Sequence, residues 1–177
     1  MRLSHFVIKM KIYKTIFAAL VVTILLSAVS RAQTPLTSLD GAKVDVQGQH
    51  GKVVLLAIGA SWLPLSGKQI DYANILAKRY AGKSVAVYFV STDSATPKSK
   101  NYASTEEIRK FAATNKLGVP VLRDPDGSAT LKKFNVDEIP SFVVLDKNGN
   151  VVGDPFGGID PKFDITVPIS KVVDRLL

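Results

Sequence analysis

The chain has 177 residues, which is enough for one domain of ordinary size with an adequate hydrophobic core. Charged residues make up 21% and hydrophobic residues 46% of the sequence, a globular composition that excludes a disordered chain. The formal net charge of +8 would suit a nucleic-acid partner, but much of it belongs to the N-terminus.

The first 32 residues have the pattern of a secretory signal. Three lysines precede an uncharged apolar run at residues 15–29, and Ser30 and Ala32 follow at the two positions that a signal peptidase reads. This run is short for a membrane span, which needs about 20 residues. We therefore predict a cleaved signal peptide at residues 1–32 and a secreted or periplasmic protein. An uncleaved N-terminal membrane anchor is the alternative.

Removal of the signal changes both the charge and the sulfur content. Cleavage after Ala32 leaves 18 basic and 15 acidic residues, a net charge of +3. No stripe of Lys and Arg with interleaved aromatics stands out, so we expect no nucleic-acid partner. The chain has no cysteine, which excludes a lipoprotein signal, and Met1 and Met10 both lie in the signal. The predicted mature protein therefore contains no sulfur.

The first half of the remaining chain alternates strand and helix patterns. Residues 36–46 alternate apolar and polar around Asp40–Gly41, which predicts a β-hairpin. The apolar runs Val53–Ile58 and Val85–Val90 are typical of strands buried on both faces. Between them, apolar residues on one helical face predict a helix over residues 64–80.

The second half begins with a polar, turn-rich segment at residues 92–103, which we predict to be an exposed loop. The sequence Ser104-Thr-Glu-Glu107 is a capping box that predicts a helix through Lys116. The same kinds of pattern predict the other elements: a strand at 120–123, a short helix at 127–134, a strand at 141–145 paired through a turn with 150–152, and a helix at 168–177 with proline in its first turn.

This order of elements predicts one α/β domain over residues 34–177, with a mixed central sheet, helices on both faces and an N-terminal hairpin. No internal repeat and no second domain are expected.

Three segments carry a resemblance to a known family. The first reads GKVVLLAIGASWLPLSGKQI at residues 51–70, and the others lie at residues 119–127 and 134–149. They resemble the thioredoxin superfamily, and within it the TlpA/ResA-like thiol–disulfide branch related to the AhpC/TSA redoxins. That branch reads G-K-V-V-L-V-N-F-W-A-x-W-C-P-P-C-x-x-E over the first segment. The resemblance implies a thioredoxin fold and, by family alone, a thiol–disulfide oxidoreductase or antioxidant role.

The sequence departs from the family at both redox cysteines. The family pattern places them at Leu63 and Ser66, and Ala57 stands where the family often has an Asp or Asn that assists proton transfer. Thiol–disulfide exchange needs sulfur at the attacking and resolving positions. A serine hydroxyl needs a base, and the only histidine after the signal is His50. We therefore predict no catalytic residue, with Leu63 and Ser66 as degenerate redox positions.

Other chemistries are excluded by the residues available. One histidine among scattered carboxylates makes no metal site, and no Gly-rich phosphate loop occurs. The segment Asp124-Pro-Asp-Gly127 resembles the start of a calcium loop but is more simply a turn at a helix entry. We expect neither a metal nor a cofactor.

The candidate peptide-binding residues surround the former redox site. The resemblance implies that Ile139–Pro140 is the loop opposite this site, with a cis-proline preceded by a residue that pairs with the backbone of a bound peptide. Trp62, Leu63 and Pro64 would complete an apolar patch next to that loop.

Each of these positions also has a purely structural interpretation. Trp62 would be a lid over the helix start, and Leu63 would be an unfavourable N-cap left by drift after loss of the cysteine. Ser66 would satisfy a first-turn N–H group, and the cis-proline would persist for folding reasons alone.

We predict an exported thioredoxin-like protein without redox activity that binds a protein or peptide at the former active-site groove. The alternatives are a thiol–disulfide oxidoreductase, as family membership alone implies, and an exported protein with no specific partner. We expect contact with a membrane only if the signal segment is uncleaved.

Overall fold

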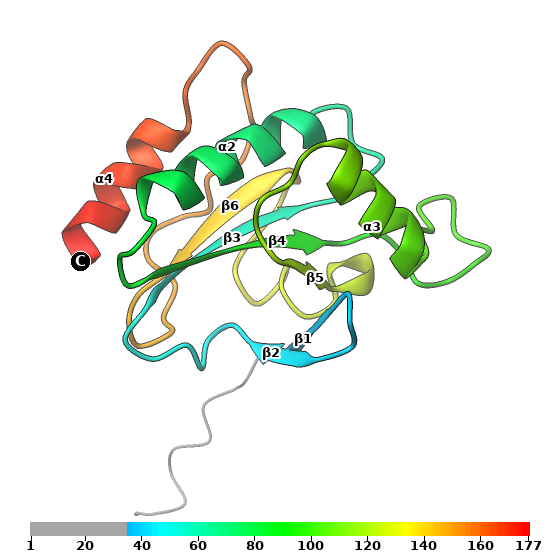
Figure 1. Cartoon of the computed structure of the whole chain (residues 1–177), viewed down its shortest axis with the longest axis horizontal. Helices are drawn as coiled ribbons and strands as arrows, with labels where there is room; N and C mark the ends of the chain where they lie inside the picture. Colours follow the sequence, from blue (N-terminus) through cyan, green and yellow to red (C-terminus); the bar gives the residue numbers. More distant parts are fainter. Residues whose placement is uncertain (1–34) are drawn as a thin grey trace, which may run out of the picture. The chain divides into compact units, whose positions relative to one another are not determined.

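A computed structural model of the chain describes residues 35–177 (Figure 1). The predicted signal peptide, residues 1–32, lies outside the described residues. Between residues 35 and 177, no helix has the length and the apolar content that crossing a membrane requires.

The described residues form one six-stranded mixed sheet in the order β2-β1-β5-β4-β3-β6. Strands β3, β4 and β5 are parallel to one another, while β6 and the β1–β2 hairpin pair antiparallel. The elements are β1 (Pro35–Ser38), β2 (Lys43–Asp45), β3 (Val53–Gly59), α2 (Ser66–Arg79), β4 (Val85–Ser91), α3 (Thr105–Thr114), β5 (Val121–Arg123), the 3₁₀ helix η1 (Pro125–Gly127), β6 (Ser141–Leu145) and α4 (Thr166–Leu176). This arrangement confirms the predicted α/β fold with an N-terminal hairpin.

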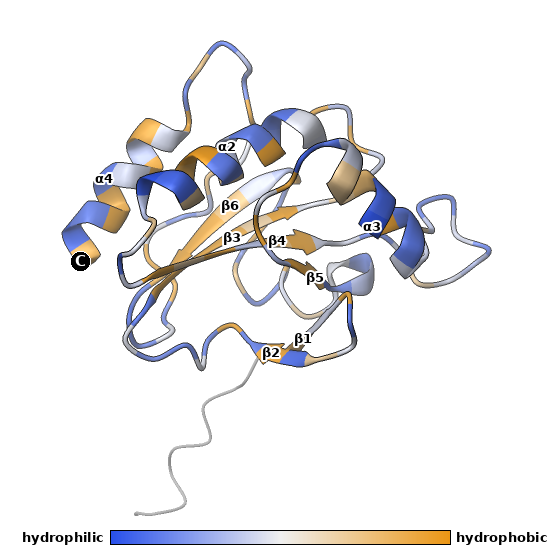
Figure 2. Ribbon diagram, viewed as in Figure 1, coloured by the Kyte–Doolittle hydropathy of each residue, from blue (hydrophilic) through white to orange (hydrophobic). Residues whose placement is uncertain are grey.

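Strand β3 is the centre of the hydrophobic core, and all seven of its residues are buried. It lies between β4 and β6, so both of its edges are paired and both of its faces are covered. Alternate residues enter opposite clusters, with Leu55 on one face and Leu56 on the other. Strands β3 and β4 are accordingly hydrophobic along most of their length, whereas the helices are mixed (Figure 2).

The two faces of the sheet have different covers. Helices α2, α3 and α4 bury side chains such as Ile70, Ile108 and Ile169 in the cluster on the first face. The second face is covered by side chains of the hairpin region and by Phe134 and Val136 from the turns after η1. Both faces of the sheet are thus covered, but the described α-helices all lie on the first face, so the predicted helices on both faces are found on one face only.

The prediction of a short helix at residues 127–134 is wrong. Its place is taken by η1 and a series of turns. Asp126 and Gly127 are consecutive residues with positive φ values of 58° and 67°, which a right-handed helix does not accommodate. The buried Asp124 carboxylate also accepts hydrogen bonds from the backbone N–H groups of Ala129 and Thr130, at 2.9 Å each, and this holds the turns in place.

Two predictions near the C-terminus are altered only in extent. The strand predicted at residues 150–152 is a single bridge between Val151 and Leu145. Helix α4 begins two residues earlier than predicted, and Pro168 lies in its first turn.

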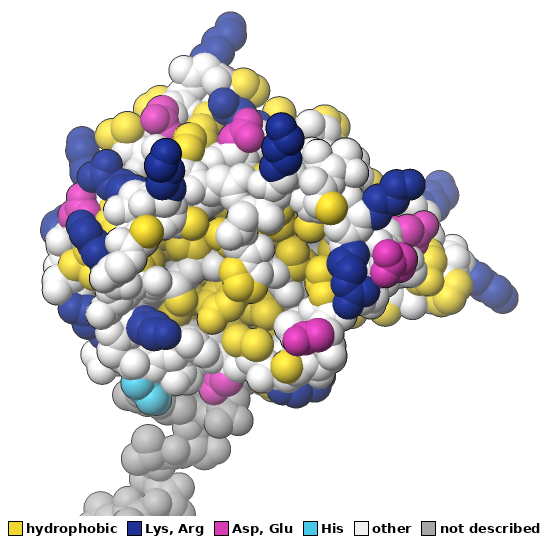
Figure 3. All heavy atoms as spheres, in the orientation of Figure 1, with side chains coloured by type: hydrophobic (Ala, Val, Ile, Leu, Met, Phe, Trp, Pro, Cys, Tyr) yellow, Lys and Arg dark blue, Asp and Glu magenta, His cyan; other side chains and the backbone are white. Residues whose placement is uncertain are grey.

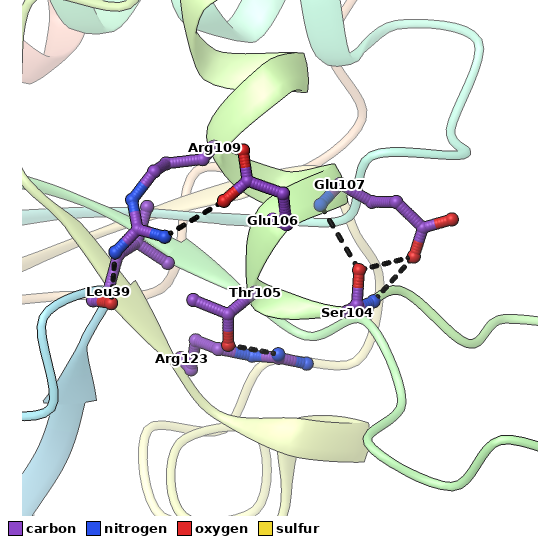
Figure 4. A network of polar contacts seen from close by, with 7 residues as sticks. All are labelled: Leu39, Ser104, Thr105, Glu106, Glu107, Arg109 and Arg123. Atoms are coloured by element: carbon purple, nitrogen blue, oxygen red, sulfur yellow. Dashed lines mark hydrogen bonds and ion pairs between the residues drawn. The ribbon is translucent and has the colours of Figure 1, made fainter.

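The predicted capping box at the start of α3 is present (Figure 4). The Ser104 hydroxyl accepts from the Glu107 backbone N–H at 3.2 Å, and the Glu107 carboxylate accepts from the Ser104 backbone N–H at 2.7 Å. A further bond from the Ser104 hydroxyl helps to lower the pKa of the Glu107 carboxyl. Arg109 donates to the Leu39 carbonyl at 2.6 Å and so ties α3 to the hairpin region.

We expect Ser104→Ala to lower the free energy of unfolding by about 1 kcal/mol, because the N-cap acceptor is lost. The matched variant Ser104→Asp retains an acceptor at the N-cap and should stay close to the parent. The lowered pKa of Glu107 adds a pH dependence: its contribution is complete above the unfolded-state pKa and is lost as the pH falls through the folded-state value. Urea unfolding at neutral and acidic pH measures both effects, and equal stability of the two variants at neutral pH would contradict this role of the cap.

Candidate functional site

The candidate site lies at the carboxyl ends of β3 and β4, where the chain turns from Gly59 into α2. Helix α2 begins at Ser66, with Leu65 at its N-cap, so the predicted start at Pro64 and the predicted N-cap at Leu63 are wrong. Backbone hydrogen bonds close the intervening turns, from Leu63 N to the residue 60 carbonyl at 3.3 Å and from Ser66 N to the Leu63 carbonyl at 3.1 Å. These turns delay the helix by two residues.

Ser66 is buried, and its hydroxyl donates a hydrogen bond to the Ala60 carbonyl oxygen. The prediction that this side chain satisfies a first-turn N–H group is therefore wrong, because the hydroxyl serves a carbonyl group instead. His50 lies before β3 and Leu63 lies after it, so the strand separates them by about 20 Å. Because Ser66 follows Leu63 at the same end of β3, no histidine of residues 35–177 lies within reach of its hydroxyl to act as a base.

Gln69 connects α2 to the sheet and to the proline loop. Its side chain is fully buried, and Nε2 donates to the carbonyl oxygens of Ile58 and Ser141, at 3.0 Å each. The other end of the amide, Oε1, has no hydrogen-bond partner. Gln69 was not among the residues predicted from the sequence, although it occupies the Glu position of the family motif. Its place in that motif is the signal by which the sequence could have identified it.

The space that Gln69 occupies depends on Gly59, the last residue of β3. A Cβ atom at residue 59 would lie 2.2 Å from Gln69 Oε1, well inside van der Waals contact. The family motif has Trp at this position. Gly59 and Gln69 are therefore a complementary pair at the base of the site.

A buried carboxylate holds the turn on the β4 side. Asp93, which is 1% exposed, accepts from the Ser61 backbone N–H at 3.0 Å, from the Ser61 hydroxyl at 2.5 Å and from the Ser91 hydroxyl at 2.7 Å. Thr92 and Ser94 are buried beside it, so the predicted exposed loop at residues 92–103 is wrong at its start. The engaged Asp93 carboxylate positions the turn that carries Trp62.

The predicted peptide-binding residues are unequally exposed. Trp62 is 50% exposed and Pro64 is also exposed, whereas Leu63 and Ile139 are partly buried and Pro140 is buried. The Ile139–Pro140 peptide bond is cis. The hydrogen bond from Gln69 to Ser141 holds the residue after the cis-proline against α2. The structure thus places the proline loop beside the start of α2, as the family resemblance implies.

The acidic side chains of the described residues are scattered rather than grouped. No group of three or more His, Asp or Glu side chains within residues 35–177 could hold a metal ion. On the face drawn in Figure 3, acidic side chains lie among the basic ones and hydrophobic side chains gather in the middle.

Comparisons with known proteins agree with this geometry. Residues 30–153 match the AhpC/TSA family. The chain is 33% identical over 116 residues to the thioredoxin-like protein YneN of Bacillus subtilis, covering 64% of this chain and 62% of that protein. It is 25% identical to the thiol-disulfide oxidoreductase ResA of Bacillus thuringiensis, covering 66% of this chain and 61% of that protein. The chain therefore spans about three fifths of the length of these relatives.

The fold is shared with solved structures. A thioredoxin-like protein from Aeropyrum pernix superposes with a TM-score of 0.65 at 23% identity, covering 91% of this chain and 99% of the other. At this identity the likeness concerns the fold alone.

We expect Gly59→Ala to destabilise the protein by about 1–3 kcal/mol, because the added methyl displaces a buried amide that makes two hydrogen bonds. Gln69→Ala removes the obstructing atom, so adding Gly59→Ala to that variant should cost much less. Unfolding free energies of the parent, both single variants and the double variant measure this coupling. Strictly additive effects would show that the two residues do not compete for the same space.

Proposed function

Because the chain belongs to the AhpC/TSA family but carries Leu63 and Ser66 at the redox positions, we propose that it is an exported, redox-inactive thioredoxin-like protein. It binds a protein or peptide reversibly in the groove between the turn at residues 62–64 and the loop at Ile139–Pro140. One observation carries this proposal: the turn, the helix and the cis-proline loop are kept in place although the sequence contains no cysteine.

The former nucleophile position supports binding rather than chemistry. Leu63 offers no reactive atom, and Ser66 is buried with its hydroxyl engaged by a carbonyl oxygen. Trp62 presents a large exposed ring next to this position. Aromatic and aliphatic groups of this kind are typical anchors of protein contacts.

The strength of such binding rests on burial and backbone pairing, because no transient disulfide can hold the partner. Complete burial of an aliphatic side chain contributes about 1.5–3 kcal/mol. A micromolar complex corresponds to about −8.2 kcal/mol, so the partly buried Leu63 together with Trp62 can supply a substantial share of it. The edge beside Ile139 would add main-chain hydrogen bonds to an extended peptide.

Export is supported by the N-terminal pattern alone. Three lysines, an apolar run and small residues at 30 and 32 precede the domain in the order of a secretory signal. We propose a secreted or periplasmic location for the domain.

We expect no disulfide-reductase turnover with insulin and a thiol donor, because neither an attacking nor a resolving sulfur is present. A cysteine-containing thioredoxin assayed in parallel provides the positive control. Turnover above background by protein free of contaminating thioredoxin would sink the proposal of a redox-inactive protein and favour the oxidoreductase alternative.

We expect Leu63→Asp to weaken peptide binding by about tenfold or more, because a charge replaces apolar surface at the centre of the groove. The probe is the strongest binder selected on the purified protein from a library of random octapeptides, and isothermal titration calorimetry measures its affinity.

The matched control is Ile75→Asp, which places the same change on an exposed aliphatic residue of α2. Thermal melts check that both variants are folded. Equal affinity of Leu63→Asp and the parent would show that the groove does not bind peptide, and so would a library that yields no binder.

A further inference from the structure

An acidic pocket adjoins the proline loop. Its volume is about 240 Å³, and its walls come from residues 135–138 before the loop, Ser141 after it and residues 154–157 across from it. Three of the lining side chains are carboxylates, those of Asp137, Glu138 and Asp154, and none of the lining residues is Lys or Arg. These residues define the acidic pocket.

The carboxylates of the acidic pocket are not neutralised by the ion pairs found in the described part of the chain. Those ion pairs join Arg79 to Asp174 and Arg109 to Glu106. The described carboxylates also form no group that could hold a metal ion. The three carboxylates of the acidic pocket thus supply negative charge without converging on a single point.

The exposed Glu138 side chain lies against Gly157 in the pocket wall. A Cβ atom at Gly157 would lie 2.5 Å from Glu138 Oε1 and 2.9 Å from its Cγ. Only a residue without a side chain leaves this space, so Gly157 forms a cradle for the Glu138 carboxylate. Any larger residue at position 157 would force that carboxylate to move.

Ser141 adds an independent sign of a polar binding site. It is 1% exposed, and its hydroxyl has no hydrogen-bond partner, although buried hydroxyl groups are almost always paired. Within β6 its side chain shares the face of Val143 and Leu145, which pack in the cluster that Phe134 and Val136 cover. The hydroxyl thus points toward the side of the sheet where the segment bearing Asp137 and Glu138 lies.

We propose that the acidic pocket receives one basic side chain, lysine or arginine, from a peptide held in the groove. This inference rests on the proposed function and specifies the class of partner. Glu138 immediately precedes Ile139, and Ser141 follows the cis-proline, so a peptide paired at this loop passes beside the pocket. Ligand pockets for whole small molecules measure about 300–1,000 Å³, so 240 Å³ suits a single side chain.

The chemistry of the pocket favours a cation that donates several hydrogen bonds. A guanidinium or ammonium group can donate to more than one carboxylate at once, and charge-assisted hydrogen bonds of this kind are about twice as strong as neutral ones. The same arrangement opposes acidic peptides, because a like charge would face three carboxylates.

Synthetic octapeptides test this proposal. The probe is the strongest binder from the random library, in which we expect Arg or Lys close to an apolar residue. Replacing its arginine with citrulline, or its lysine with acetyl-lysine, removes the charge at nearly constant shape. We expect affinity for the parent protein to fall at least tenfold, as measured by isothermal titration calorimetry.

A double variant tests whether the difference in affinity between the charged and the neutral peptide arises in the acidic pocket. In Asp137→Asn/Glu138→Gln the charged and neutral peptides should bind almost equally, because the charge no longer has a partner. The control Asp71→Asn/Glu106→Gln changes the net charge by the same amount away from the pocket and should keep the tenfold difference. An undiminished difference in the pocket variant, or equal binding of both peptides to the parent, would overturn the proposal while leaving peptide binding at Leu63 intact.

If the random library yields no binder, a second probe still tests the acidic pocket. In an NMR titration of the full chain with N-acetyl-arginine amide, we expect the backbone signals of Asp137, Glu138 and Gly157 to shift, and the shifts to vanish in Asp137→Asn/Glu138→Gln. Shifts in the parent would support the pocket even though the groove proposal had failed. Unchanged signals up to millimolar concentration would overturn the pocket.

Discussion

The buried amide of Gln69 is the contact on which the geometry of the candidate site depends. Its Nε2 group bridges the carbonyl oxygens of Ile58, in the central strand, and Ser141, directly after the cis-proline. One side chain of α2 therefore ties the helix to the central strand and to the residue after the cis-proline. The bridge therefore satisfies both donor hydrogens of a buried amide group, which would be costly to leave unpaired.

The rest of the site is arranged around this bridge. Gly59 leaves room for the amide, and the Ser66 hydroxyl closes the turn by a hydrogen bond to the Ala60 carbonyl. On the β4 side, the Asp93 carboxylate holds Ser61. Each of these groups acts on backbone rather than on a bound molecule. The turn is therefore supported without any cysteine, and it leaves Trp62 exposed.

The sequence predicts those features that depend on local patterns. The apolar run of β3 and the capping box at Ser104 were found because burial on both faces and N-capping are visible in a few consecutive residues. The helix at residues 127–134 was predicted wrongly because the hydrogen bonds from Ala129 and Thr130 to the buried Asp124 carboxylate, which hold these residues in turns, are not visible in the sequence. The burial of Asp93 was missed for a related reason, since polar residues are buried when distant donors such as Ser61 satisfy them.

The candidate site was predictable only as far as the family motif reaches. Aligning the motif places Leu63, Ser66 and the proline loop, and it offers the position of Gln69. It does not reveal that Gln69 Oε1 fits against Gly59, because residues 10 positions apart come together only when α2 packs on the sheet. The acidic pocket is even harder to predict from the sequence. It combines Glu138 with Gly157, and no pattern in either segment predicts that pairing.

The loss of sulfur changes how a groove of this kind can select a partner. A transient disulfide adds a covalent bond to the non-covalent contacts that hold a peptide. Without that bond, selectivity must come from differences in non-covalent contacts, which favour one partner and oppose others. The apolar turn at Trp62 and Leu63 discriminates weakly, because apolar surfaces accept many side chains. Three carboxylates beside the same loop add a requirement for charge, and the combination of an apolar anchor with a neighbouring basic residue is far more restrictive than either alone.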